Sequence, residues 1–399
     1  MTYLQLHNQL VEAFRPDLSQ APLIDDLTLT SLDFISGGPK GLSQKCLKTP
    51  EDLLTLFTPE IDLSSLFEIP DDEIKENKRF RYHIIQPKTE DKSSKTIILL
   101  HGLNERHWSK YLPIAVNLCR KTKKSVVLFP IAFHMNRSPE LWNNAKIMYK
   151  VSQWRKAKYP NIVDSTLSNV AISLRLQEDP ARFFWSGLET YENIISLVKS
   201  IRLGQHPVLA QEADIDFFTY SIGTFLGEII MLANQDGLFD RSRLVAFCGG
   251  PVFNRLSSVS KFILDSEADV AIYSYLIEHL ESHRKIDQNL DEFLNRPGAG
   301  PNFLAMLNYR LNREYRESRL RSLAGRIKAV AMAKDEVVPS FEVINTLKGS
   351  NRDIDIEVTV VDPPYPYRHE DPFPTSAKYE SLVDEWFDRI IGELSDFLI

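Results

Sequence analysis

Runs of apolar residues alternate with amphipathic segments along most of the chain. Residues 79–85 alternate polar and apolar side chains, which is typical of a half-exposed strand, whereas residues 96–100 are continuously apolar. A continuous apolar run that stops at a glycine is typical of a strand buried on both faces of a parallel sheet. Helical spacing then extends to Lys121, and residues 125–129 are apolar again. A strand, a helix and a second strand at this pitch predict a right-handed βαβ unit.

Two long segments interrupt this alternation, at about residues 134–180 and 254–322. Outside them, apolar strands are predicted at residues 216–220, 244–248, 327–333 and 354–361, and amphipathic helices at residues 188–201 and 379–394. The second long segment predicts one helix over residues 262–280 and another over residues 303–311. Because insertions of this length often carry lids and binding surfaces, we expect the two segments to form a helical cap.

Length and composition indicate one large globular α/β domain. Residues 1–78 show no sustained period, so we expect them to be an N-terminal extension packed on a main domain at residues 79–399. Hydrophobic residues make up 43% of the chain and charged residues 25%, which excludes a largely disordered protein. The net charge of −7 and the lack of a clustered basic face argue against a nucleic-acid partner.

The three cysteines, Cys46, Cys119 and Cys248, are too few and too scattered for a disulfide framework or a thiolate metal site. We expect them to be reduced and mostly buried. The first residues contain no basic segment followed by an apolar run, and no apolar stretch reaches the length that spans a bilayer. We therefore expect a cytoplasmic protein with neither a secretory signal nor a transmembrane segment.

The strand at residues 216–220 runs directly into Ser221, and Gly223 follows two residues later. On a tight turn between a strand and a helix, a serine hydroxyl stands clear of the sheet edge, and the first helical amide points toward an oxygen beside it. Gly223 fits this turn because the backbone there passes close to the preceding strand, without room for a Cβ atom. The G-x-S-x-G motif is incomplete, since Thr219 replaces its first glycine. The alternative interpretation of Ser221 is an ordinary helix N-cap.

Asp335 and His369 are candidates for the partners of this serine. Acyl transfer by serine needs a base that removes the hydroxyl proton and a third group that holds the base in the right tautomer. Both residues follow predicted strands, and the carboxyl ends of parallel strands meet at one edge of a sheet, so we expect all three side chains to converge. Glu336 is the alternative acid. His369 has two alternatives, an exposed loop histidine or a weak metal site with the adjacent carboxylates, but without a second histidine at ligand spacing we expect no metal.

The order Ser, Asp, His, with His101-Gly102 at the end of an earlier strand, resembles the α/β-hydrolase superfamily from about residue 80 to the C-terminus, outside the two insertions. Residues 334–339 look like the acid loop of that superfamily, and residues 368–372 look like its histidine loop. The resemblance implies an α/β-hydrolase fold, with a mostly parallel central sheet flanked by helices, helical cap insertions and an N-terminal extension.

The resemblance also implies a role for each candidate. Ser221 would be the nucleophile, His369 the general base and then the general acid, and Asp335 the orienting carboxylate. The backbone amides of Leu103 and Ile222 would form the oxyanion hole. His101, Gly102 and Gly223 would have supporting roles, with His101 bracing the oxyanion loop.

Together these features predict a serine hydrolase that cleaves an ester-like acyl bond of a small-molecule substrate through an acyl-enzyme, without a cofactor. Thioesterase, peptidase and acyltransferase activities use the same triad and stay open. The alternative from another class is a binding protein that kept the fold and lost its chemistry, which predicts no histidine within hydrogen-bond reach of Ser221. A third interpretation takes the apolar helix at residues 272–280 as a surface for lipid or partner contact.

Overall fold

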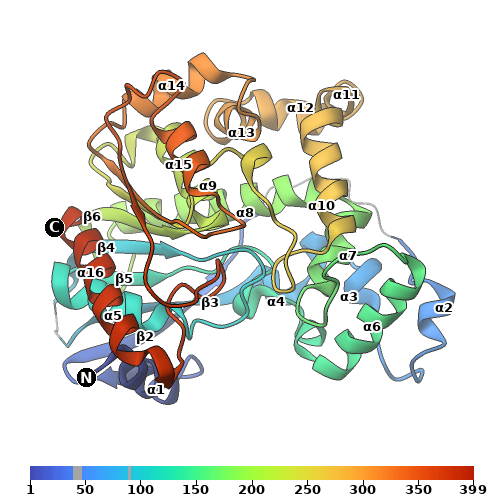
Figure 1. Ribbon diagram of the computed structural model, residues 1–399, viewed down its shortest axis with the longest axis horizontal. Coiled ribbons are helices and arrows are strands. Elements are labelled where there is room, and N and C mark those ends of the chain that lie inside the picture. Colours follow the sequence, from blue (N-terminus) through green and yellow to red (C-terminus); the bar gives the residue numbers. More distant parts are fainter. Residues whose placement is uncertain (39–46, 89–90) are drawn as a thin grey trace.

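The computed structural model describes residues 1–38, 47–88 and 91–399, so Cys46 lies outside the described residues. Within them, nine strands form one sheet in the order β1-β2-β3-β5-β4-β6-β7-β8-β9 (Figure 1). The pairs made by β2 and β3 are antiparallel, and all pairs from β5 to β9 are parallel. The strands are β1 Gln20–Ile24, β2 Leu27–Ile35, β3 Arg79–Pro87, β4 Ser93–Leu100, β5 Ser125–Leu128, β6 Leu209–Tyr220, β7 Leu244–Phe247, β8 Ile327–Met332 and β9 Glu357–Val361.

Helices cover both faces of the sheet. Helices α1, α5 and α16 contact one another on one face, and α8, α9 and α15 pack on the other (Figure 1). The helices are α1 Tyr3–Ala13, α2 Glu51–Leu54, α3 Ser64–Phe67, α4 Lys75–Lys78, α5 Tyr111–Thr122, α6 Ala145–Lys158, α7 Val170–Glu178, α8 Ala181–Arg202, α9 Ile222–Ala233, α10 Ser266–Tyr273, α11 Leu280–Arg284, α12 Gln288–Asn295, α13 Ala299–Leu307, α14 Arg313–Arg321, α15 Ser340–Leu347 and α16 Glu380–Phe397. A π-helical turn at Ser274–His279 joins α10 to α11. None of the described helices combines the length and the apolar character needed to cross a bilayer.

The parallel strands end together at one edge of the sheet. All four side chains of β7 are fully buried, because helices cover both faces of the sheet, and this burial explains the apolar runs in the sequence. Leu100 of β4 is in register with Thr219 of β6. Phe247 of β7 is in register with Tyr220 of β6 on one side and with Val330 of β8 on the other. The loops that follow β4, β6, β7 and β8 therefore leave the sheet at the same edge.

Several element boundaries differ from the sequence prediction. The helix predicted over residues 262–280 begins at Ser266, because the Asp265 side chain accepts a hydrogen bond from the Ala268 amide and caps it. The helix predicted over residues 303–311 is α13, which ends at Leu307. Strands β1 and β2, which lie within residues 1–78, were not predicted.

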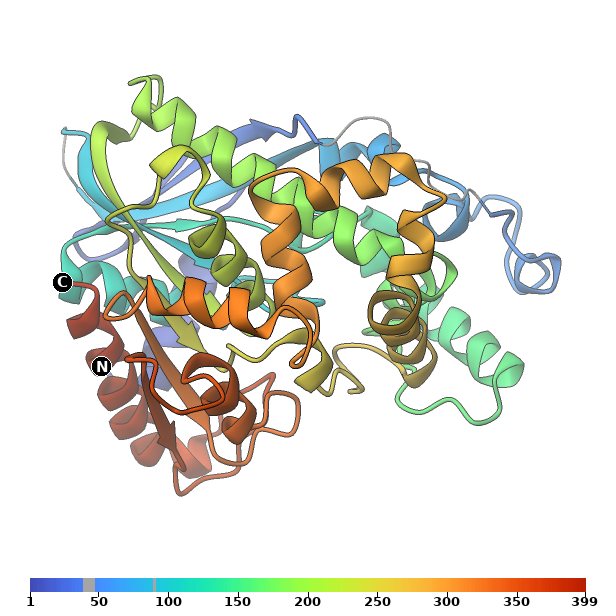
Figure 2. The ribbon, with the colours of Figure 1, turned by 90° about the horizontal axis from the view of Figure 1, so that it is seen from above.

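Residues 47–78 pack against the first insertion in a lobe beside the sheet, seen as the blue and green helices at the right of Figure 2. Phe67 of α3 contacts Trp154 of α6 edge to face, with ring centroids 6.5 Å apart. Arg175 of α7 forms a buried ion pair with Asp71. The lobe therefore has its own small apolar core and a buried charge pair.

The described cysteines and the tryptophans of the first insertion are buried. Cys119 and Cys248 are free thiols, as predicted. Trp142 and Trp154 belong to the apolar core of the lobe. Burial raises the pKa of the Cys248 thiol well above its ordinary value, so this thiol stays protonated.

Candidate active site

Ser221 lies on the turn between β6 and α9. Strand β6 ends at Tyr220 and α9 begins at Ile222, so the serine is the single residue between them. Its backbone has φ 55° and ψ −123°, a conformation that non-glycine residues rarely adopt because the Cβ atom crowds the backbone. A strained serine between a strand and a helix has the geometry of a nucleophile elbow.

Two glycines allow α9 to approach its neighbouring strands closely enough for this turn. A Cβ atom at Gly223 would lie 2.6 Å from the carbonyl oxygens of Leu100 and His101. The close approach is therefore to the end of β4, and not to the preceding strand as the sequence suggested. One helical turn later, a Cβ atom at Gly227 would lie 2.8 Å from Cγ2 of Thr219. The threonine fits in place of the first motif glycine because the helix has a glycine opposite it.

The structure brings Ser221, His369 and Asp335 together. Ser221 Oγ lies 2.7 Å from His369 Nε2, and His369 Nδ1 lies 2.7 Å from Asp335 Oδ2. Because a carboxylate only accepts hydrogen bonds, Nδ1 carries the imidazole proton, and Nε2 accepts from the serine hydroxyl. The other Asp335 oxygen accepts the backbone N–H groups of Val337, at 2.9 Å, and Val338, at 2.8 Å. The acid loop therefore fixes the carboxylate, which in turn orients the imidazole.

The other interpretations of these loops do not fit the geometry. Glu336 is exposed, whereas Asp335 and His369 are 5% and 4% exposed. Hydrogen bonds engage both ring nitrogens of His369, so it is not an exposed loop histidine. Among the described residues, no three histidine, cysteine, aspartate or glutamate side chains converge as metal ligands.

Hydrogen bonds fix the shape of the loop that follows β4, residues 101–110, here called the β4 loop. The Ile131 amide donates to His101 Nε2 at 2.9 Å, so His101 Nδ1 carries the ring proton and donates it to the Gly102 carbonyl oxygen at 2.8 Å. Burial lowers the pKa of His101 well below its ordinary value, which keeps the ring neutral. The Gly102 amide donates to the Tyr111 hydroxyl at 2.9 Å. His101 and Tyr111 thus brace the loop on both sides of Gly102.

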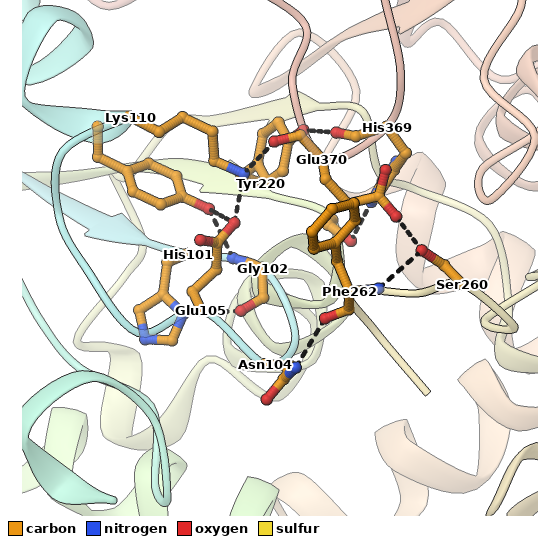
Figure 3. Close-up of polar contacts among 12 residues, drawn as sticks. His101, Gly102, Asn104, Glu105, Lys110, Tyr220, Ser260, Phe262, His369 and Glu370 are labelled. Carbon is orange, nitrogen blue, oxygen red and sulfur yellow. Dashed lines mark hydrogen bonds and ion pairs between the residues drawn. The ribbon is translucent and has the colours of Figure 1, made fainter. Parts of the chain in front are cut away.

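Lys110 joins the β4 loop to the histidine loop (Figure 3). Its ammonium group forms an ion pair with Glu105 and donates to the backbone carbonyl of Glu370 at 3.0 Å. The same ammonium lies 4.4 Å from the ring centre of Tyr220, whose hydroxyl donates to the backbone carbonyl of His369. The backbone that carries the imidazole is therefore held from both β6 and the β4 loop. The sequence carried no signal for these contacts, because the partners are far apart along the chain.

Ser221 lines a cavity of about 60 Å³ that the second insertion covers. Leu103 and Ile222, the positions that the superfamily resemblance implies for the oxyanion hole, line the same cavity. Ile222 is the first residue of α9, so its N–H group has no acceptor within the helix. A donor with no partner in its own helix is free to bind an oxygen next to Ser221.

Residues 258–264, here called the covering segment, are tied across the site (Figure 3). Asn104 of the β4 loop donates from its side chain to the carbonyl oxygen of Phe262 at 2.7 Å, and the Ser260 hydroxyl donates to the Glu370 carboxylate. Asn104, Phe262 and Glu370 also line an open hollow of about 830 Å³, bounded by the β4 loop, the histidine loop and the first insertion. The covering segment contributes to both spaces, with Phe262 lining the hollow and Ser258, Ile263 and Leu264 lining the Ser221 cavity.

Comparisons with solved structures found matches at low sequence identity. The peroxisomal alpha-beta-hydrolase Lpx1 from Saccharomyces cerevisiae is 12% identical, with 94% of this chain and 90% of that chain covered and a TM-score of 0.41. An S-formylglutathione hydrolase from Agrobacterium tumefaciens is 14% identical, with coverages of 94% and 98% and a TM-score of 0.44. The esterase Pf2001 from Pyrococcus furiosus is 13% identical, with coverages of 80% and 86% and a TM-score of 0.40.

A comparison with curated protein sequences gave no match. The largely parallel sheet, the elbow after its interior strand β6 and the chain order Ser, Asp, His confirm the predicted α/β-hydrolase fold. The model of one protein family, described as a family of unknown function, matches the chain over residues 1–399. The chain therefore belongs to the family DUF6051.

Proposed function

We propose that this protein is a serine hydrolase that cleaves an ester-like acyl bond through an acyl-enzyme on Ser221. The observation that carries the proposal is the hydrogen-bond chain from Ser221 Oγ through both ring nitrogens of His369 to Asp335, with 2.7 Å at each step. A helix N-cap serine needs neither the positive φ of Ser221 nor a buried imidazole at its hydroxyl. Hydrolase activity accounts for both features.

In the proposed reaction, Ser221 Oγ bonds to the acyl carbon while His369 Nε2 accepts the hydroxyl proton. Asp335 stabilises the imidazolium and holds its tautomer. His369 then gives the proton to the leaving oxygen, the ester C–O bond breaks, and the acyl group stays on Ser221. Water attacks through the same base, releasing the acid and restoring the serine.

The oxyanion of both tetrahedral intermediates would bind the amides of Leu103 and Ile222. These donors are fixed before the reaction, because the helix start and the hydrogen-bonded β4 loop hold them, and a preorganised donor stabilises developing charge without reorganisation. Losing one such donor costs roughly 3 to 4 kcal/mol of transition-state stabilisation in known enzymes. Side-chain substitutions at Leu103 should therefore matter less than changes in the shape of the β4 loop.

We further propose that residues 134–180 and 254–322 form a cap on an α/β-hydrolase domain at residues 79–399, with residues 1–78 as an N-terminal extension. Much of the wall of the Ser221 cavity comes from the covering segment and α10, which supports the cap. Arg155 of α6 and Asp265 at the start of α10, both fully buried, join the two insertions by an ion pair. The free thiols of the described cysteines are compatible with the proposed cytoplasmic location.

The alternative functions are less well supported. A binding protein without chemistry predicts no histidine near Ser221, and His369 lies 2.7 Å away. The helix that suggested a lipid surface turns one apolar face inward, since Ile272, Leu276 and Leu280 are 1–3% exposed, whereas Tyr273 on its other side is 41% exposed. Thioesterase, peptidase and acyltransferase activities use the same groups and are distinguished by substrate screening.

Labelling with a fluorophosphonate probe and peptide mass mapping tests the proposal, because the probe reacts with activated serines. Wild type should be labelled at Ser221, and labelling should be lost in Ser221→Ala and His369→Ala. The exposed residue Ser322 provides a control, and Ser322→Ala should be labelled like wild type. Unlabelled wild type, or undiminished labelling of Ser221→Ala, would refute the proposed function.

A further inference from the structure

A second cavity, of about 70 Å³, adjoins the cavity that Ser221 lines. Leu103, Phe183 and Ile222 line both cavities, so the two spaces meet beside the proposed oxyanion hole. The second cavity lies between α8, α9 and α13, and its walls are largely aromatic and aliphatic, with Ile131, Phe184, Leu188, Phe225, Ile229 and Phe303 among them. An acyl group on Ser221 would have this space next to its carbonyl.

Two polar side chains in this apolar wall have atoms without a hydrogen-bond partner. His134 and Tyr191 line the cavity and are 4% and 3% exposed. Among the described residues, no group pairs with His134 Nε2 or with the Tyr191 hydroxyl. Nearly all buried polar atoms in proteins are paired, and an unpaired one destabilises the fold. Around this cavity they are two positions at which a ligand can supply the missing partner.

The hydrogen bond of the other His134 nitrogen determines which ligand group fits. His134 Nδ1 lies 2.8 Å from the carbonyl oxygen of Ala132, and a carbonyl only accepts, so Nδ1 carries the proton. Burial lowers the pKa of His134 to about 4, so the ring is neutral near pH 7 and Nε2 is an acceptor. Its partner must therefore donate, which a carboxylate, a ketone or an ether cannot do. In an apolar cavity a neutral hydroxyl is a better donor than a charged ammonium.

The two side chains have different neighbours in the fold. The His134 ring lies 5.2 Å from that of His101, which begins the β4 loop, so it is at the end near the oxyanion hole. The Tyr191 hydroxyl lies near the start of α13, 3.5 Å from where a Cβ atom of Gly298, the residue before that helix, would lie. At roughly 10 to 15 Å³ for each water-sized group, the cavity holds on the order of five to seven non-hydrogen atoms. This is the size of a short acyl chain.

We propose that this cavity is an acyl pocket that selects short hydroxyacyl groups, with the substrate hydroxyl donating to His134 Nε2. The inference rests on the proposed function, because it assumes that the acyl group is carried on Ser221. It adds a substrate class: short-chain esters that carry a hydroxyl close to the acyl carbonyl. Phe183, which lines both cavities, would contact the acyl chain where it passes from one to the other.

Paired p-nitrophenyl esters test the inference, one of butyrate and one of each enantiomer of 3-hydroxybutyrate. In wild type, kcat/KM should be about tenfold or more higher for one hydroxy ester than for the butyrate ester, the value expected for one buried hydrogen bond. The His134→Asn side chain can keep the donor to the Ala132 carbonyl but lacks Nε2, so this preference should be lost. His134→Gln places an amide oxygen near the Nε2 position and should restore part of it.

Two further variants keep the test independent of His134 folding defects. Tyr191→Phe removes the second unpaired atom with little change of shape, and should lower the hydroxy ester preference less than His134→Asn does. His206→Asn is the matched control, because His206 is a buried histidine outside both cavities and should leave the preference unchanged.

Each outcome bears on one claim. Equal kcat/KM for the hydroxy and plain esters, with fluorophosphonate labelling at Ser221 intact, would overturn the hydroxyacyl pocket and leave the proposed function standing. A hydroxy ester preference that persists in His134→Asn would also overturn it. Absence of both labelling and ester hydrolysis in wild type would overturn the proposed function, and the pocket with it.

Discussion

Asp265→Asn should destabilise the protein strongly, because it leaves a buried guanidinium without its counter-ion. Arg155 donates to both Asp265 oxygens, at 2.6 and 2.7 Å, and both side chains are 0% exposed. Removing one partner of a buried pair typically costs about 3 to 5 kcal/mol. Asparagine retains an oxygen that can cap α10, so the roughly 1 kcal/mol of the helix cap is largely preserved and the measured loss reports the ion pair.

Urea unfolding followed by circular dichroism at pH 7 measures this loss. The matched control is Asp291→Asn, which breaks the pair between Arg284 and Asp291, whose side chains are 16% and 44% exposed. A pair this accessible to solvent contributes at most about 1 kcal/mol. Because Asp265 directly follows the covering segment, limited proteolysis of the Asp265 variant should cleave faster within residues 258–264. An Asp265→Asn variant no less stable than Asp291→Asn would refute the reasoning.

Two further predictions concern α9. The Glu228 carboxyl is fully buried, and burial raises its pKa well above the ordinary value of 4.5, so it stays protonated in the folded state. The free energy of unfolding therefore falls by about 1.4 kcal/mol per pH unit as the pH rises from that ordinary value toward the raised pKa of the folded state. Glu228→Gln should therefore raise the urea midpoint at pH 7 and flatten the dependence of that midpoint on pH. A wild-type midpoint that rises between pH 4.5 and pH 7 would contradict the prediction. Gly223→Ala places a Cβ atom 2.6 Å from two backbone oxygens and should abolish labelling of Ser221, whereas Gly392→Ala, with only a flexible lysine tip nearby at 3.6 Å, should retain it. Normal labelling of Gly223→Ala would argue against a tightly packed elbow.

The parallel half of the sheet could be predicted because burial on both faces leaves continuous apolar runs. Strand β7 is such a case, with all of its side chains buried. Strand β1 could not be predicted, since it contains Pro22, which is tolerated there only because β1 is at the edge of the sheet. Strand β2 buries Thr28 and Thr30, so polar residues occupy positions where an apolar pattern would have revealed it. Tertiary packing determined both strands.

The candidate site could be predicted to the extent that its residues follow strands. Ser221, Asp335 and His369 stand after apolar runs, and parallel topology places such positions at one edge of the sheet. The groups that hold the loops could not be predicted in this way. Lys110 and the Glu370 carbonyl are 260 residues apart, and only the folded chain brings them within 3.0 Å. His134 likewise stood out only when its unpaired nitrogen and the cavity beside it were seen together.

Detection of the acyl-enzyme tests the central claim most directly. Rapid mixing with p-nitrophenyl butyrate, with intact-mass analysis of quenched samples, measures whether a covalent intermediate forms on Ser221 before turnover. The account predicts a burst of p-nitrophenol close to one equivalent, a butyryl adduct that maps to Ser221, and neither in Ser221→Ala. Hydrolysis at equal rates by wild type and Ser221→Ala, with no adduct in either, would contradict it.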